Sequence, residues 1–292
     1  MPEFLYFAPG FVILIEVFSY IIHRILRIPY RLHYYVRPKA SKKTIATVVF
    51  LHGIGDSLES WDQVYANMPS NVKVIGIDLL GFGKSPKPSW VTYNAKTQAA
   101  AVLGTLLRMG VRRPVIIVGH SMGAIVGVEI AKRAPFAVTS LILCSPPFYT
   151  AEQEKKRLFP NTDTLLKDIY RMIKRNPETF VKLATIAKKV GIISKKSDLS
   201  DVSMASYMDA LEASIVNQSS LEDVKRLKKP VTIIYGRFDG LVVPANLRQL
   251  GKQNDTITVK SVLAGHEIQG LFVSALNKEL DLVITNGTKG KA

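Results

Sequence analysis

The chain has 292 residues, of which 47% are hydrophobic, and a formal net charge of +16 at pH 7. This length fits one large α/β domain with an insertion or two small domains, and the composition excludes a disordered or fibrous chain. The single cysteine, Cys144, excludes an internal disulfide, and the basic charge favours anionic membrane over nucleic acid because no recognisable nucleic-acid module accompanies it.

Residues 4–28 form a strongly apolar run. Basic residues overlap or follow it, namely Arg24, Arg27, Arg31, Arg37, Lys39, Lys42 and Lys43. A cleaved signal peptide is not indicated, because no basic side chain precedes the run and no small-residue cleavage site is evident. Pro9 and Gly10 interrupt the run and Glu16 lies in its middle, which weighs against a membrane-spanning helix.

From Glu16 onward the run shows a helical pattern. The more polar residues recur at helical spacing, and they are Glu16, Ser19, Tyr20, His23, Arg24 and Arg27. The pattern favours an amphipathic helix within residues 1–29 that lies on a membrane surface. A spanning helix, and a helix docked on the protein or on a second subunit of a homodimer, remain alternatives. We therefore expect a membrane-associated protein; if the helix spans, its basic flank places the rest of the chain in the cytoplasm.

Short apolar runs alternate with helix-like segments through the rest of the chain. Tyr30–Val36 predicts an edge strand and Gln98–Met109 a helix, and residues 286–292 are typical of a frayed tail. Buried strands are expected at Ile45–Leu51, Val72–Ile77, Val115–Val118, Val138–Leu143, Val231–Tyr235 and Ile257–Val262. The alternation predicts an α/β fold with a mostly parallel central β-sheet flanked by helices.

One segment interrupts this alternation. Residues 148–220 are helix-rich, carry charges of both signs and contain no strand of the buried kind, which indicates a helical cap inserted over the sheet. We therefore expect an N-terminal helix at 1–29, a core at 30–147 and 221–292, and a cap at 148–220.

The sequence Gly119-His120-Ser121-Met122-Gly123 lies directly between a predicted strand and a helix-like run. A serine on such a sharp strand-to-helix turn is a nucleophile elbow. The residues two before and two after the serine must be small, which explains Gly119 and Gly123. The turn places the Ser121 oxygen at a helix N-terminus, where the helix dipole favours a developing anion.

A serine nucleophile needs a base, usually a histidine oriented by a carboxylate. His266 follows the last strand and is the predicted base, and Asp239 follows the penultimate strand on the same sheet edge and is the predicted acid. For His23 and His33 we expect surface or headgroup roles, and for His120 a packing role with its side chain directed away from the site.

Two backbone N–H groups are expected to form an oxyanion hole, each stabilising the transition state by about 3 to 4 kcal/mol. Met122 starts the helix after the serine and is predicted to supply one. The loop His52-Gly53-Ile54-Gly55 is placed to supply the other through the Ile54 amide. The sequence has no cluster of residues at metal-ligand spacing, so we expect neither a metal nor an organic cofactor.

These motifs, together with Trp61 and the segment Asp78–Ser85, resemble the α/β-hydrolase fold superfamily over about residues 30–285. The resemblance implies a structural role for His52 and Gly53 in shaping their loop, and for Asp78–Ser85 as a structural loop near the site. It also implies that the cap forms the acyl or alcohol pocket. Ser121 excludes the branches with an aspartate nucleophile, and the absence of proline beside Gly53 disfavours the C–C bond hydrolases.

The residues and the resemblance together predict a serine esterase. We expect hydrolysis of carboxylic esters of small to medium acyl chain length through an acyl-enzyme, including lactones such as acyl-homoserine lactones. The alternatives are a monoacylglycerol-type lipase or C–C hydrolase, a lyase or cofactor-free peroxidase that uses the same residues, and a non-catalytic binding module.

Overall fold

The computed structural model describes residues 17–37, 44–112, 114–149, 201–216 and 220–289. Within these ranges seven strands form one sheet in the order β1-β3-β2-β4-β5-β6-β7. The strands are β1 (Tyr34–Val36), β2 (Ala46–Leu51), β3 (Val72–Ile77), β4 (Val115–His120), β5 (Val138–Cys144), β6 (Val231–Gly236) and β7 (Ile257–Val262). β1 pairs antiparallel with β3 and the other neighbouring pairs are parallel, which confirms the predicted fold class.

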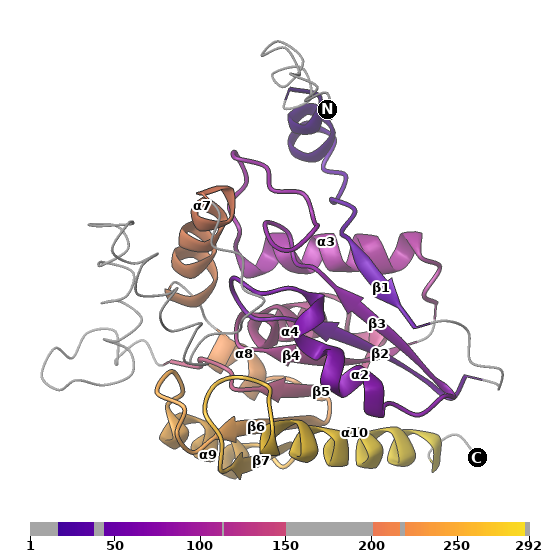
Figure 1. The fold of residues 1–292 in the computed structure, drawn as a ribbon, viewed down its shortest axis with the longest axis vertical. Coiled ribbons are helices and arrows are strands. Elements are labelled where there is room, and N and C mark those ends of the chain that lie inside the picture. The colour runs from indigo at the N-terminus through magenta and orange to yellow at the C-terminus, as the bar shows by residue number, and fades with distance from the viewer. Residues whose placement is uncertain (1–16, 38–43, 113, 150–200, 217–219, 290–292) are drawn as a thin grey trace, which may run out of the picture.

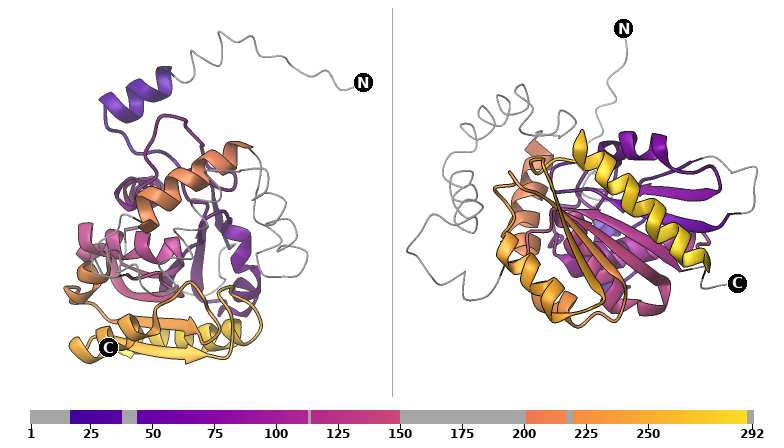
Figure 2. Two further views of the ribbon diagram at one scale, coloured as in Figure 1. Left: turned by 90° about the vertical axis from the view of Figure 1, so that its left-hand side faces the viewer. Right: turned by 90° about the horizontal axis from the view of Figure 1, so that it is seen from below.

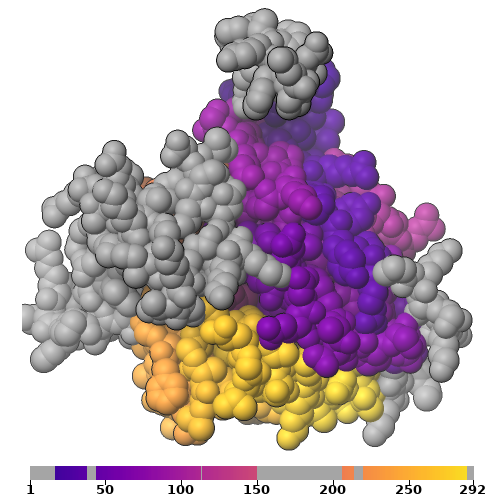
Figure 3. Space-filling view, viewed as in Figure 1, coloured from indigo at the N-terminus to yellow at the C-terminus, as the bar shows by residue number. Residues whose placement is uncertain are grey.

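Helices cover both faces of the sheet (Figures 1 and 2). One face packs against α3 (Ala95–Arg108), α4 (Met122–Arg133), α8 (Ser220–Lys225) and α9 (Pro244–Gln253). The other face packs against α2 (Asp62–Asn67) and α10 (Leu271–Lys289), whose surfaces adjoin in the space-filling view (Figure 3). Because both faces are covered, β4 and β6 are buried along their whole length and are predominantly apolar.

Shorter helical segments complete the described chain. α7 (Asp201–Ala210) continues into a π-helical turn at Leu211–Val216, and a second π-helical turn at Ile21–Ile25 follows helical residues 17–20. Single 3₁₀ turns lie at Leu58–Trp61 and Pro135–Ala137. We refer to residues 17–25 as the N-terminal helix. None of the helices within the described ranges is long and apolar enough to cross a membrane.

Three predicted elements differ from those observed by three residues or more, and the bounds of the predicted buried strands agree to within two residues. The edge strand expected at Tyr30–Val36 begins only at Tyr34, because the Leu32 N–H bonds the Thr105 hydroxyl of α3 at 2.9 Å instead of a neighbouring strand. The predicted helix Gln98–Met109 begins earlier, at Ala95, because the Asn94 side chain caps the Thr97 N–H at 2.9 Å.

The tail expected at residues 286–292 is helical as far as Lys289, and the last three residues lie outside the described ranges. The apolar side chains of Leu280 and Ile284 are buried against the sheet and hold this end of α10 in place. Of the predicted cap at 148–220, residues 150–200 and 217–219 also lie outside the described ranges, as do residues 1–16 of the predicted N-terminal helix.

Candidate active site

Ser121 lies on the turn between β4 and α4 with φ of 51° and ψ of −117°, a backbone conformation that residues other than glycine rarely adopt. The two glycines leave no room for a larger residue. A Cβ added to Gly119 would lie 2.4 Å from the Gly123 carbonyl oxygen, and one added to Gly123 would lie 2.2 Å from that of Leu51. Backbone therefore packs directly against backbone at Gly119 and at Gly123, and this packing maintains the strained conformation of Ser121.

The loop after β2 lies directly beside the serine. A Cβ added to Gly53 would lie 3.4 Å from the Ser121 Cβ, so this glycine allows the close approach. Ile54 follows Gly53 on this loop, and Met122 is the first residue of α4, where backbone N–H groups have no acceptor within the helix. The two predicted oxyanion donors thus come from segments that meet at the serine.

His266 and Asp239 form a direct hydrogen bond at the same edge of the sheet. The His266 Nδ1–H donates to Asp239 Oδ2 at 2.9 Å, and the Leu241 N–H donates to Asp239 Oδ1 at 2.9 Å. Burial alone lowers the pKa of His266, but the hydrogen bond and charge of Asp239 outweigh it and raise that pKa above its ordinary value. Burial likewise opposes ionisation of Asp239, and the same bond overcomes it and lowers the pKa of this carboxyl.

Gly236 permits the histidine loop to approach the aspartate loop. This glycine ends β6, and a Cβ added to it would lie 2.1 Å from the Gly265 carbonyl oxygen. The Phe238 N–H also bonds the Ala264 carbonyl oxygen at 3.0 Å. Backbone contacts between the two loops therefore hold Asp239 and His266 close to each other, independently of the hydrogen bond between their side chains.

His120 connects the serine turn with the histidine loop. Its Nε2–H donates to the His266 carbonyl oxygen at 2.9 Å, and the two rings lie 4.8 Å apart between centroids. Burial lowers the pKa of His120 to about 3, so the ring is neutral. The sequence-based expectation of a side chain directed away from the site is wrong in this respect, because His120 contacts the backbone of the predicted base.

His52 holds the loop beside the serine. Its Nδ1–H donates to the Gly53 carbonyl oxygen at 2.7 Å, and its Nε2 accepts the Leu79 N–H at 2.9 Å. The ring is buried, and both of its nitrogens have a hydrogen-bond partner. His52 therefore ties the loop after β2 to the loop after β3.

The buried carboxylate of Asp78 organises that second loop. It accepts the Leu58 N–H at 2.7 Å and the Lys84 N–H at 2.9 Å, and it pairs with His33 Nδ1 at 2.8 Å. The expected surface or headgroup role of His33 is therefore wrong, because this residue partners a buried carboxylate. No local sequence signal could reveal the pair, since its members lie 45 residues apart.

A further carboxyl group that the sequence did not indicate lies beside the predicted base. Burial raises the pKa of Glu267 to about 7; the charge of His266 opposes this rise and that of Asp56 adds to it. The ring of Tyr207 from α7 packs over this part of the site. It lies so close to Gly55 that a Cβ added to this glycine would be 2.9 Å from the ring.

Glu267 is expected to make folding stability depend on pH. The pKa of Glu267 is about 7 in the folded protein, above the ordinary 4.5, so folding disfavours the charged carboxylate. The free energy of unfolding therefore falls as the pH rises from about 4.5 to about 7. Glu267→Gln cannot ionise and therefore does not lose this stability. The free energy of unfolding of the variant minus that of the wild type should rise by roughly 1 to 3 kcal/mol between about pH 5 and pH 8. Urea unfolding at both pH values measures the gain, and an equal difference at the two would contradict it.

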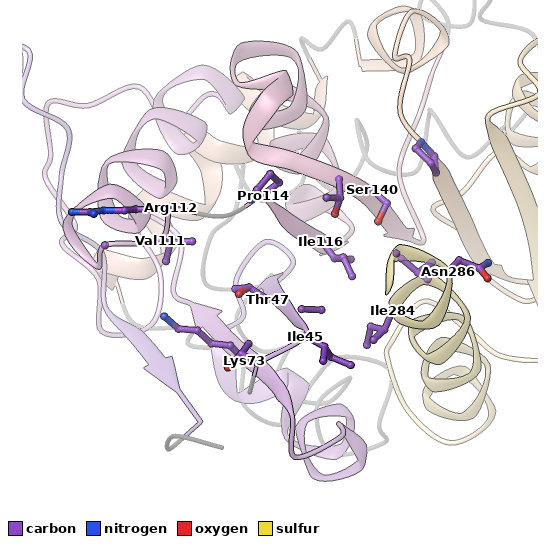
Figure 4. A pocket seen from close by; sticks show the side chains of 17 residues that line it. Ile45, Thr47, Lys73, Val111, Arg112, Pro114, Ile116, Ser140, Ile284 and Asn286 are labelled. Carbon is purple, nitrogen blue, oxygen red and sulfur yellow. The ribbon is translucent and has the colours of Figure 1, made fainter. Parts of the chain in front are cut away.

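A separate pocket of about 720 Å³ lies at the opposite end of the sheet (Figure 4). It opens at the amino ends of β2, β4 and β5, between Ile45, Ile116, Ser140 and the end of α10 at Ile284. None of the described residues that line it is a histidine, aspartate or glutamate. The titratable side chains among the described lining residues are those of Lys73 and Arg112, and the pocket is remote from Ser121, which lies at the carboxyl end of β4.

Comparisons with known proteins agree with this architecture. A family model for the alpha/beta hydrolase fold matches residues 46–181. The chain is 34% identical to a probable lysophospholipase, BODYGUARD 2 of Arabidopsis thaliana, over 118 residues, which are 39% of this chain and 25% of that protein. The chain spans only about a quarter of the length of the curated relatives of this kind.

Solved structures extend the similarity to most of the chain. An esterase from Exiguobacterium antarcticum has a TM-score of 0.71 at 17% identity, covering 87% of this chain and 96% of its own. An enol-lactonase from Burkholderia xenovorans has a TM-score of 0.63 at 19% identity with the same coverage. These similarities show that the chain has the α/β-hydrolase fold.

Proposed function

We propose that the protein is a serine hydrolase of carboxylic esters that works through an acyl-enzyme. The observation that carries the proposal is the hydrogen bond of 2.9 Å between His266 and Asp239 at the sheet edge that also holds the strained Ser121 turn. A binding module has no need of a buried, ionised aspartate that raises the basicity of a histidine beside a strained serine.

The proposed reaction has two stages. With the Nδ1–H donated to Asp239, the Nε2 of His266 carries the lone pair that accepts the Ser121 hydroxyl proton as the oxygen attacks the ester carbonyl. The resulting oxyanion accepts hydrogen bonds from the Ile54 and Met122 N–H groups. His266 returns the proton to the departing alcohol; water then attacks the acyl-enzyme by the same route, and the acid leaves.

The substrate class is proposed as esters of small to medium acyl chain length, including lactones such as acyl-homoserine lactones. Similarity to proteins described as an esterase, an enol-lactonase and a probable lysophospholipase supports the ester class. A monoacylglycerol-type lipase remains the second candidate, favoured by the lysophospholipase name of the relative. A panel of p-nitrophenyl esters of rising chain length, run beside acyl lactones and a monoacylglycerol, separates these substrates.

We expect a fluorophosphonate probe to label the wild type on Ser121 and to leave Ser121→Ala unlabelled. The phosphonate reacts only with a serine whose proton a neighbouring base accepts. Gel fluorescence and peptide mass spectrometry measure the label.

Ser140→Ala is the matched control for this experiment, because Ser140 is also buried but lies at the amino end of β5. It should label like the wild type. If the wild type is not labelled, or if Ser121→Ala is labelled equally, Ser121 is excluded as the nucleophile. Strong labelling with poor turnover of every ester would instead favour a lyase or peroxidase.

A further inference from the structure

The N-terminal helix contacts the rest of the protein through the side chains of Ser19, Tyr20 and His23. The Ser19 hydroxyl lies 3.2 Å from the Tyr30 hydroxyl, and the His23 ring stacks on Tyr30 with centroids 3.5 Å apart. Tyr20 packs edge-on against Trp90, with centroids 5.1 Å apart. Ser19, Tyr20 and His23 of the polar stripe therefore contact the rest of the protein, whereas Arg24 and Arg27 of the same stripe are exposed.

The other side of this segment is exposed and apolar. Phe18, Ile25 and Leu26 are 64%, 62% and 60% exposed. Val17, Ile21 and Ile28 are also exposed. Contiguous apolar side chains of this kind mark an interaction site rather than an ordinary surface. We call these six residues the apolar face.

The apolar face lies at the same end of the molecule as the candidate active site. Trp90, which contacts the N-terminal helix, belongs to the loop that follows β3 at the carboxyl edge of the sheet. In the same loop the Tyr93 N–H donates to Asp209 of α7 at 2.6 Å. The loop therefore contacts both the N-terminal helix and α7 (Figures 1 and 2), and Tyr207 of α7 packs over the loop beside Ser121.

The basic residues beside the apolar face indicate which kind of partner binds it. Arg24, Arg27 and Arg31 are exposed beside it, within a chain of formal net charge +16. A second copy placed on this face by a two-fold axis would bring the two sets of arginines together, which is unfavourable. A surface with a hydrocarbon interior and anionic phosphates or carboxylates satisfies both the apolar and the basic side chains.

We propose that the apolar face inserts into the surface of an anionic lipid bilayer and turns the carboxyl edge of the sheet, with Ser121, toward the membrane. The consequence for substrate rests on the proposed function: esters reach Ser121 from the bilayer, so amphiphilic esters are the preferred class. The contacts of Tyr20 and His23 hold the helix against the rest of the protein and so set the angle at which the molecule meets the lipid.

The binding test uses the full chain and vesicles of equal parts phosphatidylcholine and phosphatidylserine. The combined variant Phe18→Ser, Ile25→Ser and Leu26→Ser should weaken co-sedimentation at least about tenfold, because burial of three large apolar side chains is lost. The matched control is Leu107→Ser, Phe136→Ser and Leu282→Ser, which removes exposed apolar side chains elsewhere and should bind like the wild type.

The orientation test is independent of catalysis. Ser89→Cys, in the loop after β3, and Thr139→Cys, near the amino end of β5, are each labelled with an environment-sensitive fluorophore; Cys144 is buried. Vesicles should shift the emission of the label at position 89 to shorter wavelength and leave the label at position 139 unchanged.

Three results would overturn the inference: equal sedimentation of the wild type and the Phe18/Ile25/Leu26 variant, equal emission changes at the two labelled positions, or a lipid-independent dimer that this variant dissociates. Turnover of a soluble p-nitrophenyl ester is measured in parallel. The Phe18/Ile25/Leu26 variant should retain that turnover while losing at least about tenfold in turnover of a vesicle-embedded ester. Absence of turnover on every ester with vesicle binding and orientation intact would instead exclude the proposed function.

Discussion

Asp239→Asn is expected to lower kcat for ester hydrolysis by about 10⁴-fold with little loss of folding stability. An asparagine amide in this position favours the His266 tautomer with the proton on Nε2, which cannot accept the Ser121 proton. The substitution also removes the negative charge that raises the pKa of His266. Initial rates on a soluble p-nitrophenyl ester measure the loss.

The pH dependence of kcat/KM provides a second readout of the same pair. As the proposed base, His266 acts only when unprotonated, so we expect wild-type activity to fall as pH falls through its raised pKa, above the ordinary 6.5. In Asp239→Asn this limb should move to lower pH because the partner charge is gone. Asp281→Asn, a change on the exposed surface of α10, should alter neither rate nor profile. An unchanged limb in Asp239→Asn would show that Asp239 does not set the basicity of the essential group.

Gly123→Ala should destabilise the fold by at least about 3 kcal/mol. The added Cβ would lie 2.2 Å from the Leu51 carbonyl oxygen and 2.6 Å from that of His52. Both contacts are with backbone, so relief requires α4 to move away from β2 rather than a side chain to rotate. Urea unfolding monitored by circular dichroism measures the change.

Gly127→Ala is the matched control in the same helix. There an added Cβ meets the Ile117 Cγ2 at 3.2 Å, a side-chain contact that a small adjustment relieves, and alanine has the higher helix propensity. We expect a net change within about 1 kcal/mol. Equal destabilisation by the two substitutions would contradict the explanation, because it would assign the effect to the helix rather than to the serine turn.

Sequence reasoning predicted the elements whose signals are local. Runs such as Val72–Ile77 are apolar because both faces of the sheet are covered, and the structure has a strand there. The glycines beside Ser121 are required by the turn itself. The places of Asp239 and His266 follow from parallel strands, whose carboxyl ends meet at one edge of the sheet.

The remaining features depend on partners distant in sequence. The His120 ring bonds a carbonyl oxygen 146 residues away, and His33 bonds Asp78 across 45 residues. The side of the N-terminal helix that faces the protein was likewise unpredictable. A polar stripe at helical spacing indicates two faces but not which one packs, and here Tyr30 and Trp90 offer the stripe aromatic and hydroxyl partners.

The direction of a single short strand decides where other proteins can be attached. Because β1 runs antiparallel to β3, Tyr34 lies opposite Ile77, and the chain before β1 emerges at the edge that carries Ser121. The last turns of α10 line the pocket at the other edge. A fluorescent protein joined after α10 would therefore extend away from the edge that carries Ser121, whereas one joined before the N-terminal helix would lie near that edge, where we propose that substrate and lipid bind.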